Sequence, residues 1–63
     1  MTDLVIKAIE DLYGDTPFSM DAFCKHMEDS KQMSFDDAWD TLVALEDHGW
    51  LMATKSGWLC MVP

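Results

Sequence analysis

Between Ser34 and Leu51, apolar residues recur at the spacing of one helix face, and the stretch predicts an amphipathic helix over about 34–48. Ser34 is placed to cap its first turn, and Gly49 is placed to adopt a left-handed conformation after its last turn. At about 100° per residue, one arc of about 160° is apolar and is expected to face the core. Its members are Phe35, Ala38, Trp39, Leu42, Val43 and Leu45. Glu46 also falls in this arc, but its place near the end of the helix lets it reach solvent. The opposite arc contains Asp36, Asp37, Asp40, Thr41, Ala44, Asp47 and His48.

Two earlier stretches have the same helical spacing. The first predicts a helix over about 2–13 that ends at Gly14, and its apolar positions are Leu4, Val5, Ala8, Ile9 and Leu12. The second predicts a helix over about 19–28 that Ser19 caps, with a buried stripe of Met20, Phe23, Cys24 and Met27. Between them, Pro17 favours an extended chain at Phe18, which we expect to pair with the later strands.

Beyond Gly49, two apolar segments flank a turn and predict a β-hairpin. The strands are expected at about 50–53 and 58–62, with the turn at 54–57. One face of the hairpin is expected to bury Leu51, Ala53, Leu59 and Met61. The other face would then leave apolar side chains in solvent, as a candidate contact patch drawn from Trp50, Met52, Trp58, Cys60 and Val62.

The whole order predicts an α+β fold, with three helices and a C-terminal hairpin in a single domain over 1–63. This order, the run AWDTLVALEDHGWL from Ala38 to Leu51 and the run PFSMDAF before the second helix resemble the winged helix-turn-helix family. The resemblance implies a third helix that docks in the DNA major groove and a hairpin wing that touches the DNA backbone. Carried over by position, the groove-facing residues would be Asp36, Asp37, Asp40, Thr41, Ala44 and Asp47, and the wing tip would be Lys55.

The charge of the chain departs from the pattern of a DNA-binding protein. Twelve acidic residues stand against four lysines, no arginine is present, and the net charge is −8. Specific DNA binders contact phosphates through lysine and arginine and read guanine with arginine, and the predicted third helix has neither residue. A helix rich in aspartate would repel DNA, so direct nucleic-acid binding by a monomer is not expected.

We therefore expect a small acidic regulator or inhibitor that binds another protein and presents a DNA-mimicking carboxylate face to a basic partner, such as a polymerase or nuclease. By analogy, phages and mobile elements direct compact acidic proteins of this kind at host enzymes. The expected contact residues are Asp36, Asp37, Asp40, Thr41, Asp47, Met52 and Trp58. The alternatives are a dimeric winged-helix transcriptional regulator that binds DNA, an accessory subunit, or an acidic surface that only keeps the chain soluble.

No catalytic, metal or cofactor site is expected. Two cysteines and two histidines match no usual zinc spacing, and a disulfide is not expected in the cytoplasm, where we place the chain. The nearby aspartates lack the glycine-containing loop of a calcium site. No nucleophile motif or phosphate-binding loop is present, which argues against an enzyme. No apolar run approaches the length of a membrane span, and the small core favours help from a partner or a homodimer.

Overall fold

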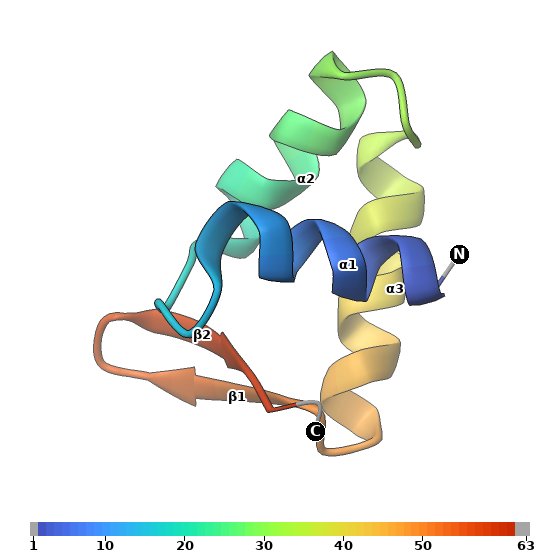
Figure 1. The fold of residues 1–63 in the computed structure, drawn as a ribbon. Helices are drawn as coiled ribbons and strands as arrows, with labels where there is room; N and C mark the ends of the chain where they lie inside the picture. Colours follow the sequence, from blue (N-terminus) through green and yellow to red (C-terminus); the bar gives the residue numbers. More distant parts are fainter. Residues whose placement is uncertain (1, 62–63) are drawn as a thin grey trace.

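The chain forms three helices followed by a two-stranded hairpin (Figure 1). The computed structural model describes residues 2–61. The helices are α1 (Thr2–Tyr13), α2 (Met20–Asp29) and α3 (Phe35–Asp47), and the strands are β1 (Leu51–Thr54) and β2 (Gly57–Cys60). The predicted α+β fold is therefore confirmed, and each described helix boundary lies within one residue of the expected position.

The helix ends follow from the side chains at the boundaries. The Ser19 hydroxyl accepts a hydrogen bond from the backbone N–H of Ala22 at 3.3 Å, and the Ser34 hydroxyl accepts one from Asp37 at 3.2 Å. Each bond satisfies an N–H group that has no partner within the helix. After α3, Gly49 adopts the expected left-handed conformation, with φ at 79°. This reversal directs the chain into β1.

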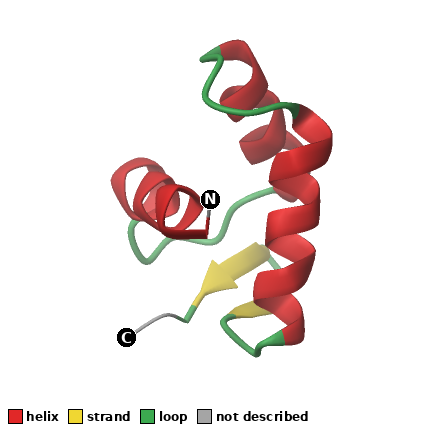
Figure 2. Ribbon diagram, turned by 90° about the vertical axis from the view of Figure 1, so that its right-hand side faces the viewer, coloured by secondary structure: helices red, strands yellow, loops and turns green. Residues whose placement is uncertain are grey.

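Buried side chains from the helices, the α1–α2 connection and β1 form the core. Its members are Val5, Ile9, Phe18, Met20, Phe23, Cys24, Met27, Ala38, Leu42, Leu45 and Leu51. In Figure 1, α1 crosses in front of α2 and α3, and the hairpin lies below them. In the side view of Figure 2, α1 and the hairpin both lie on the same side of α3. Within residues 2–61, no helix or strand lies on the opposite side of α3.

The segment between α1 and α2 is attached to the hairpin, as expected for Phe18. The N–H of Phe18 donates to the carbonyl of Trp58 at 2.8 Å, and the N–H of Trp58 donates back at 2.7 Å. The Phe18 ring stacks on Tyr13, with 4.9 Å between centroids, and it also lies 5.8 Å from Phe23. The two hydrogen bonds between Phe18 and Trp58 hold β2 next to the segment that leads into α2.

The register of the hairpin corrects the predicted distribution of its side chains. Leu51 lies opposite Cys60 and Ala53 lies opposite Trp58, so these residues share a face. The prediction that Leu59 and Met61 share the core face of Leu51 was wrong, and Ala53, which was expected to be buried, is exposed. Trp58 and Cys60, two of the candidates for the solvent face, lie on the face of Leu51 instead. Trp58 and Cys60 are half-buried and pack against the core, whereas Met61 is exposed.

The predicted turn at 54–57 already places Ala53 opposite Trp58, so the error lay in the assignment of faces and not in the register. Thr54 and Gly57 form the last pair of the ladder, which leaves only Lys55 and Ser56 in the loop. The Thr54 hydroxyl donates to the Gly57 carbonyl at 2.7 Å and accepts from the Ser56 N–H at 3.2 Å. Directly opposite residues share a face, so Leu59 and Met61 cannot lie on the face of Leu51 and Ala53. Val62, which was expected in the second strand, lies outside the described residues.

The core stripe of α1 is narrower than predicted. Val5 and Ile9 are fully buried, as expected, but Leu4 and Leu12 are exposed. They lie on the side of α1 that borders a hollow towards α2, where packing is incomplete. No helix within residues 2–61 combines the length and the apolar character needed to cross a membrane.

Candidate functional site

The exposed side of α3 contains the predicted carboxylates. Asp36, Asp37, Asp40 and Asp47 are all exposed. Asp36, Asp40 and Asp47 fall within about 40° of one another around the helix, and Asp37 lies about 100° from Asp36. Three carboxylates therefore form one stripe along α3, and no basic side chain lies on this helix.

The two ends of α3 differ in their electrostatics. Asp36 and Asp37 lie in the first turn, where the helix dipole favours negative charge. Glu46 and Asp47 lie in the last turn, which has no basic residue and where the dipole opposes negative charge. The acidic stripe thus extends over a turn where carboxylates lower the stability of the helix.

Thr41 does not belong to the exposed face, which corrects the prediction. Its side chain is only 8% exposed, and its hydroxyl donates to the carbonyl of Asp37 at 2.8 Å. By satisfying its hydroxyl within the helix, Thr41 can lie beside the buried Leu42 and Leu45. A partner cannot reach it without moving α3.

Two apolar residues of α3 that were expected in the core are exposed instead. Trp39 is 38% exposed and Val43 is 43% exposed, although both were expected in the core. The indole of Trp39 stacks on Phe35, with 6.1 Å between centroids and 10° between ring planes, so its position is fixed. Since Phe35, Trp39 and Val43 follow one another at four-residue intervals, they form an apolar stripe beside the acidic one.

One signal in the sequence pointed to this stripe. Glu46 falls between Phe35 and Trp39 in projection around α3, and the structure exposes it. A carboxylate in the middle of a supposed core sector indicates that this flank faces water. The buried arc is narrower and contains Ala38, Thr41, Leu42 and Leu45.

A hollow of about 370 Å³ opens beside Trp39. It lies where α3, the start of α2 and β2 meet, and it is lined by Phe18, Ser19, Met20, Asp21, Trp39, Gly57 and Trp58. Trp58, which was predicted to project outward, instead forms part of this lining and packs against the core. Asp21 is the one charged residue of the lining.

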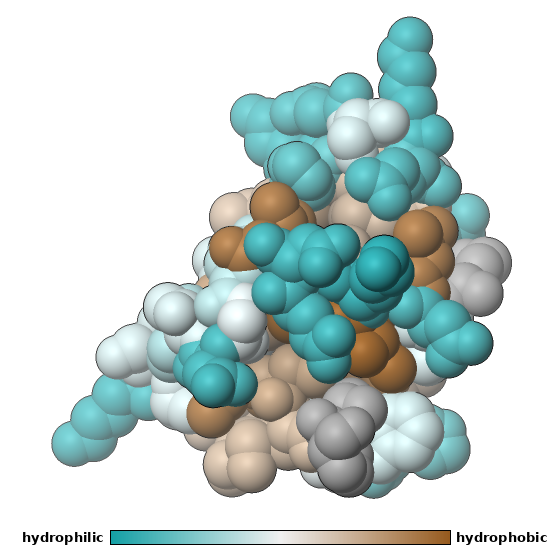
Figure 3. All heavy atoms as spheres, in the orientation of Figure 1, coloured by the Kyte–Doolittle hydropathy of each residue, from teal (hydrophilic) through white to brown (hydrophobic). Residues whose placement is uncertain are grey.

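The hairpin provides a separate apolar surface. Met52 is 48% exposed, as expected, and it shares the outer face of the hairpin with Leu59. Trp50, before β1, is also exposed and lies 5.6 Å from the ring of His48. On the face shown in Figure 3, polar residues cover the front, and apolar residues reach the surface below α1, in the region of the hairpin. Lys55 is exposed in the turn.

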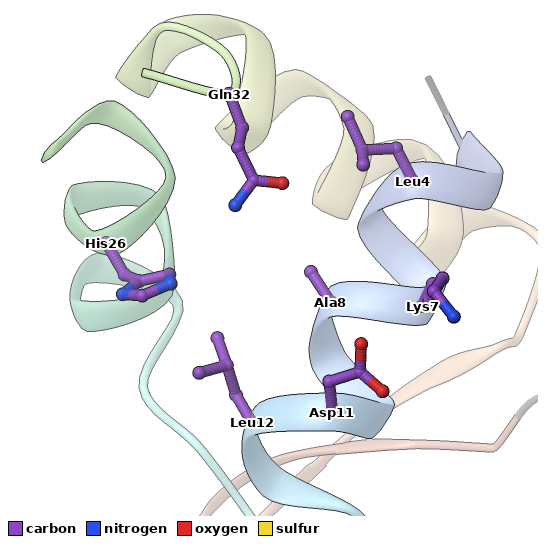
Figure 4. Close-up of a pocket in the computed structure, with 7 residues that line it drawn as sticks. All are labelled: Leu4, Lys7, Ala8, Asp11, Leu12, His26 and Gln32. Atoms are coloured by element: carbon purple, nitrogen blue, oxygen red, sulfur yellow. The ribbon is translucent and has the colours of Figure 1, made fainter. Parts of the chain in front are cut away.

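A second hollow, of about 200 Å³, lies between α1 and α2 (Figure 4). Leu4, Ala8 and Leu12 line it from α1, and His26 and Gln32 line it from the other side. Lys7 and Asp11 complete the lining, which contains no cysteine or hydroxyl nucleophile. The hollow is an apolar depression with polar groups along its edges.

The cysteines and acidic residues within residues 2–61 are not grouped as a metal site. Within residues 2–61, no three His, Cys, Asp or Glu side chains are grouped so that they could hold a metal ion. Both cysteines are free. Burial, with a smaller contribution from the negative charge of Asp21, raises the pKa of Cys24 to about 11. This thiol is therefore protonated at neutral pH and is a poor nucleophile.

Comparisons with known proteins assign the chain to no group: no protein-family model matches it, and no curated protein or solved structure is significantly similar to it.

Proposed function

We propose that this chain is a small acidic regulator that binds a nucleic-acid-binding protein through the exposed side of α3. The observation that supports the proposal is the pairing of two parallel stripes on this helix. One is the carboxylate stripe of Asp36, Asp40 and Asp47, and the other is the apolar stripe of Phe35, Trp39 and Val43. No other element of the described chain covers either stripe completely.

The two stripes supply different parts of a binding energy. The carboxylates attract a basic surface over a distance and can occupy the positions that phosphates take on such a surface. Exposed charge pairs contribute little to affinity, with about 0–1 kcal/mol each. An exposed aromatic residue such as Trp39 supplies more, because aromatic anchors dominate the energetics of many interfaces.

The test is the capture of a basic protein from a bacterial lysate, with and without nuclease and over a series of salt concentrations. We expect a nucleic-acid enzyme to be retained after nuclease treatment and to be released by salt. Asp40→Lys should weaken retention and lower the salt concentration that releases the partner. Glu10→Lys on α1 is the matched control, since it makes the same change in charge at an exposed helical site away from α3. Equal retention by both variants would refute the proposal.

A second candidate function rests on the observed order of three helices and a hairpin, which agrees with the resemblance to winged helix-turn-helix domains. In that case the chain is a transcriptional regulator that binds DNA through α3. A regulator should bind duplex DNA at low salt, and Asp40→Lys should strengthen that binding. A gel-shift assay of both proteins distinguishes the two functions, because the acidic regulator should ignore DNA.

A further inference from the structure

The hollow beside Trp39 combines aromatic walls with a single carboxylate. Trp39 and Trp58 line it from α3 and β2, beside Phe18, whose own ring is buried against Tyr13 and Phe23. Asp21 contributes the charge from the first turn of α2. The lining contains no lysine, arginine or histidine. The hollow therefore suits a group that is both flat and positively charged.

Contacts within the chain support the two tryptophans before any ligand binds. The Trp39 ring stacks on Phe35 at 10° between planes. The backbone of Trp58 is held by two hydrogen bonds to Phe18, and its side chain packs against the core. Gly57 also lies in the lining, and a side chain there would meet the backbone of Phe18 at 2.7 Å. Preformed walls reduce the entropy that a ligand loses on binding.

We propose that this hollow receives the guanidinium group of an arginine from the basic partner. A guanidinium is planar, stacks on aromatic faces and binds carboxylates through two parallel hydrogen bonds. Indole rings are the best cation–π partners among aromatic side chains. The net charge of −8 and the carboxylates of α3 favour the approach of a basic segment to this side of the molecule. The inference rests on the proposed function in requiring a basic protein partner.

The test uses a peptide probe and the indole signals of the three tryptophans. A short peptide with one arginine between glycines, blocked at both ends, is titrated into labelled protein and followed by NMR. We expect the indole N–H signals of Trp39 and Trp58 to move in a saturable manner, while Trp50, which is not part of the lining, serves as the internal reference. The same peptide with citrulline in place of arginine keeps the shape without the charge and should leave the signals unchanged.

Two variants test the walls and the charge separately. Asp21→Asn keeps the shape of the side chain, and Trp39→Ala changes a residue that is already exposed, so both should fold. Each should weaken binding of the arginine peptide by at least about fivefold, as expected for the loss of a cation–π contact or a charged hydrogen bond. Asp29→Asn, an exposed position at the other end of α2, is the control and should change the binding by less than about twofold.

The outcomes separate this inference from the proposed function. An equal response to the citrulline or a lysine peptide would overturn the assignment to a guanidinium, as would unchanged binding in Asp21→Asn. Movement confined to the amides of Asp36, Asp40 and Asp47 would overturn it too, while the acidic face of α3 would stand. Movement of both indoles, combined with full partner retention by Asp40→Lys, would confirm the arginine site and refute the acidic face.

Discussion

The two cysteines occupy different environments in spite of their shared chemistry. Cys24, on α2, is fully buried in the hydrophobic core of the protein, and Cys60 is half-buried on the hairpin. The burial of Cys24 places an ionisable group where its charged form is disfavoured. Ionisation of this thiol at alkaline pH is therefore expected to lower the stability of the fold.

We expect the free energy of unfolding to fall as pH rises from about 9 to 11. The pKa of Cys24 is raised from its ordinary value of 9.0 to about 11, so the unfolded chain loses this proton first. The stabilisation is complete below the unfolded pKa and is lost as pH rises through the folded one, by about 3 kcal/mol in all. Burial also raises the pKa of Tyr13, which adds a loss of the same sign above pH 10.

Urea unfolding at pH 8 and at pH 11 measures this loss, and Cys24→Ala is the control. The variant should be less stable at pH 8, because it leaves a small cavity, but its stability should fall less steeply with pH. Parallel curves for the two proteins would show that Cys24 does not carry the pH dependence.

At the scale of the elements, the attachment of β2 to the α1–α2 connection depends on Gly57. Its φ of 138° is unfavourable for any other residue, and a Cβ atom would lie 2.7 Å from the carbonyl oxygen of Phe18. Gly57→Ala should therefore destabilise the protein by about 3 kcal/mol and loosen the bridge between Phe18 and Trp58. Urea unfolding and amide exchange at Trp58 measure the two effects.

Gly49→Ala is the matched control for backbone strain. Gly49 also has a positive φ, at 79°, but a Cβ atom there would meet nothing within 4 Å. The expected cost is about 1–2 kcal/mol, from conformation alone. If both variants lose the same stability, the close approach of Phe18 to Gly57 does not matter to the fold.

The helix dipole of α3 allows a second prediction at this scale. Asp36→Asn should destabilise the protein by about 0.3–1 kcal/mol, and Asp47→Asn should stabilise it by a similar amount. Both residues are exposed, and both changes remove one negative charge, so a difference in sign reports position along the helix. Unfolding midpoints at low salt provide the measurement, and a gain in both variants would indicate general charge repulsion instead.

The sequence predicted the elements better than it predicted the faces. Caps and glycines defined the helix ends, since Ser19, Ser34 and Gly49 act locally. The hairpin faces were misassigned because nearly every strand residue is apolar, so the alternation of residue types did not mark the buried face. Of the candidate contact residues, the four aspartates and Met52 are exposed, whereas Thr41 and Trp58 are not free on the surface.

Glu46 was the one signal in the sequence that the flank of Trp39 and Val43 faces water, because the exposure of these two residues otherwise depends on neighbouring elements. A helical stripe shows which residues are apolar, but the width of the buried arc depends on which elements pack against it. In this chain only one side of α3 is covered, so the outer part of the stripe faces solvent (Figure 2). The hollow beside Trp39 likewise depends on the bridge between Phe18 and Trp58.

At the scale of the whole molecule, the net charge of −8 on 63 residues acts on folding and on binding in opposite directions. In the folded state the carboxylates repel one another, and salt screens this repulsion. In a complex, the carboxylates attract the basic side chains of the partner, and salt screens that attraction as well. The same ions should therefore stabilise the isolated chain and weaken its complex.

We expect the urea midpoint of the isolated protein to rise when sodium chloride is raised from about 0.01 M to about 0.5 M, which shortens the Debye length from about 30 Å to less than 8 Å. Over the same range, the affinity for a basic partner should fall by at least about tenfold. Glu10→Lys lowers the net negative charge without changing α3, so it should reduce the first effect and leave the second nearly intact. Asp40→Lys should reduce both. If salt changes stability but not affinity, the acidic surface serves solubility, and the contact with a partner depends on the apolar stripe of Phe35, Trp39 and Val43.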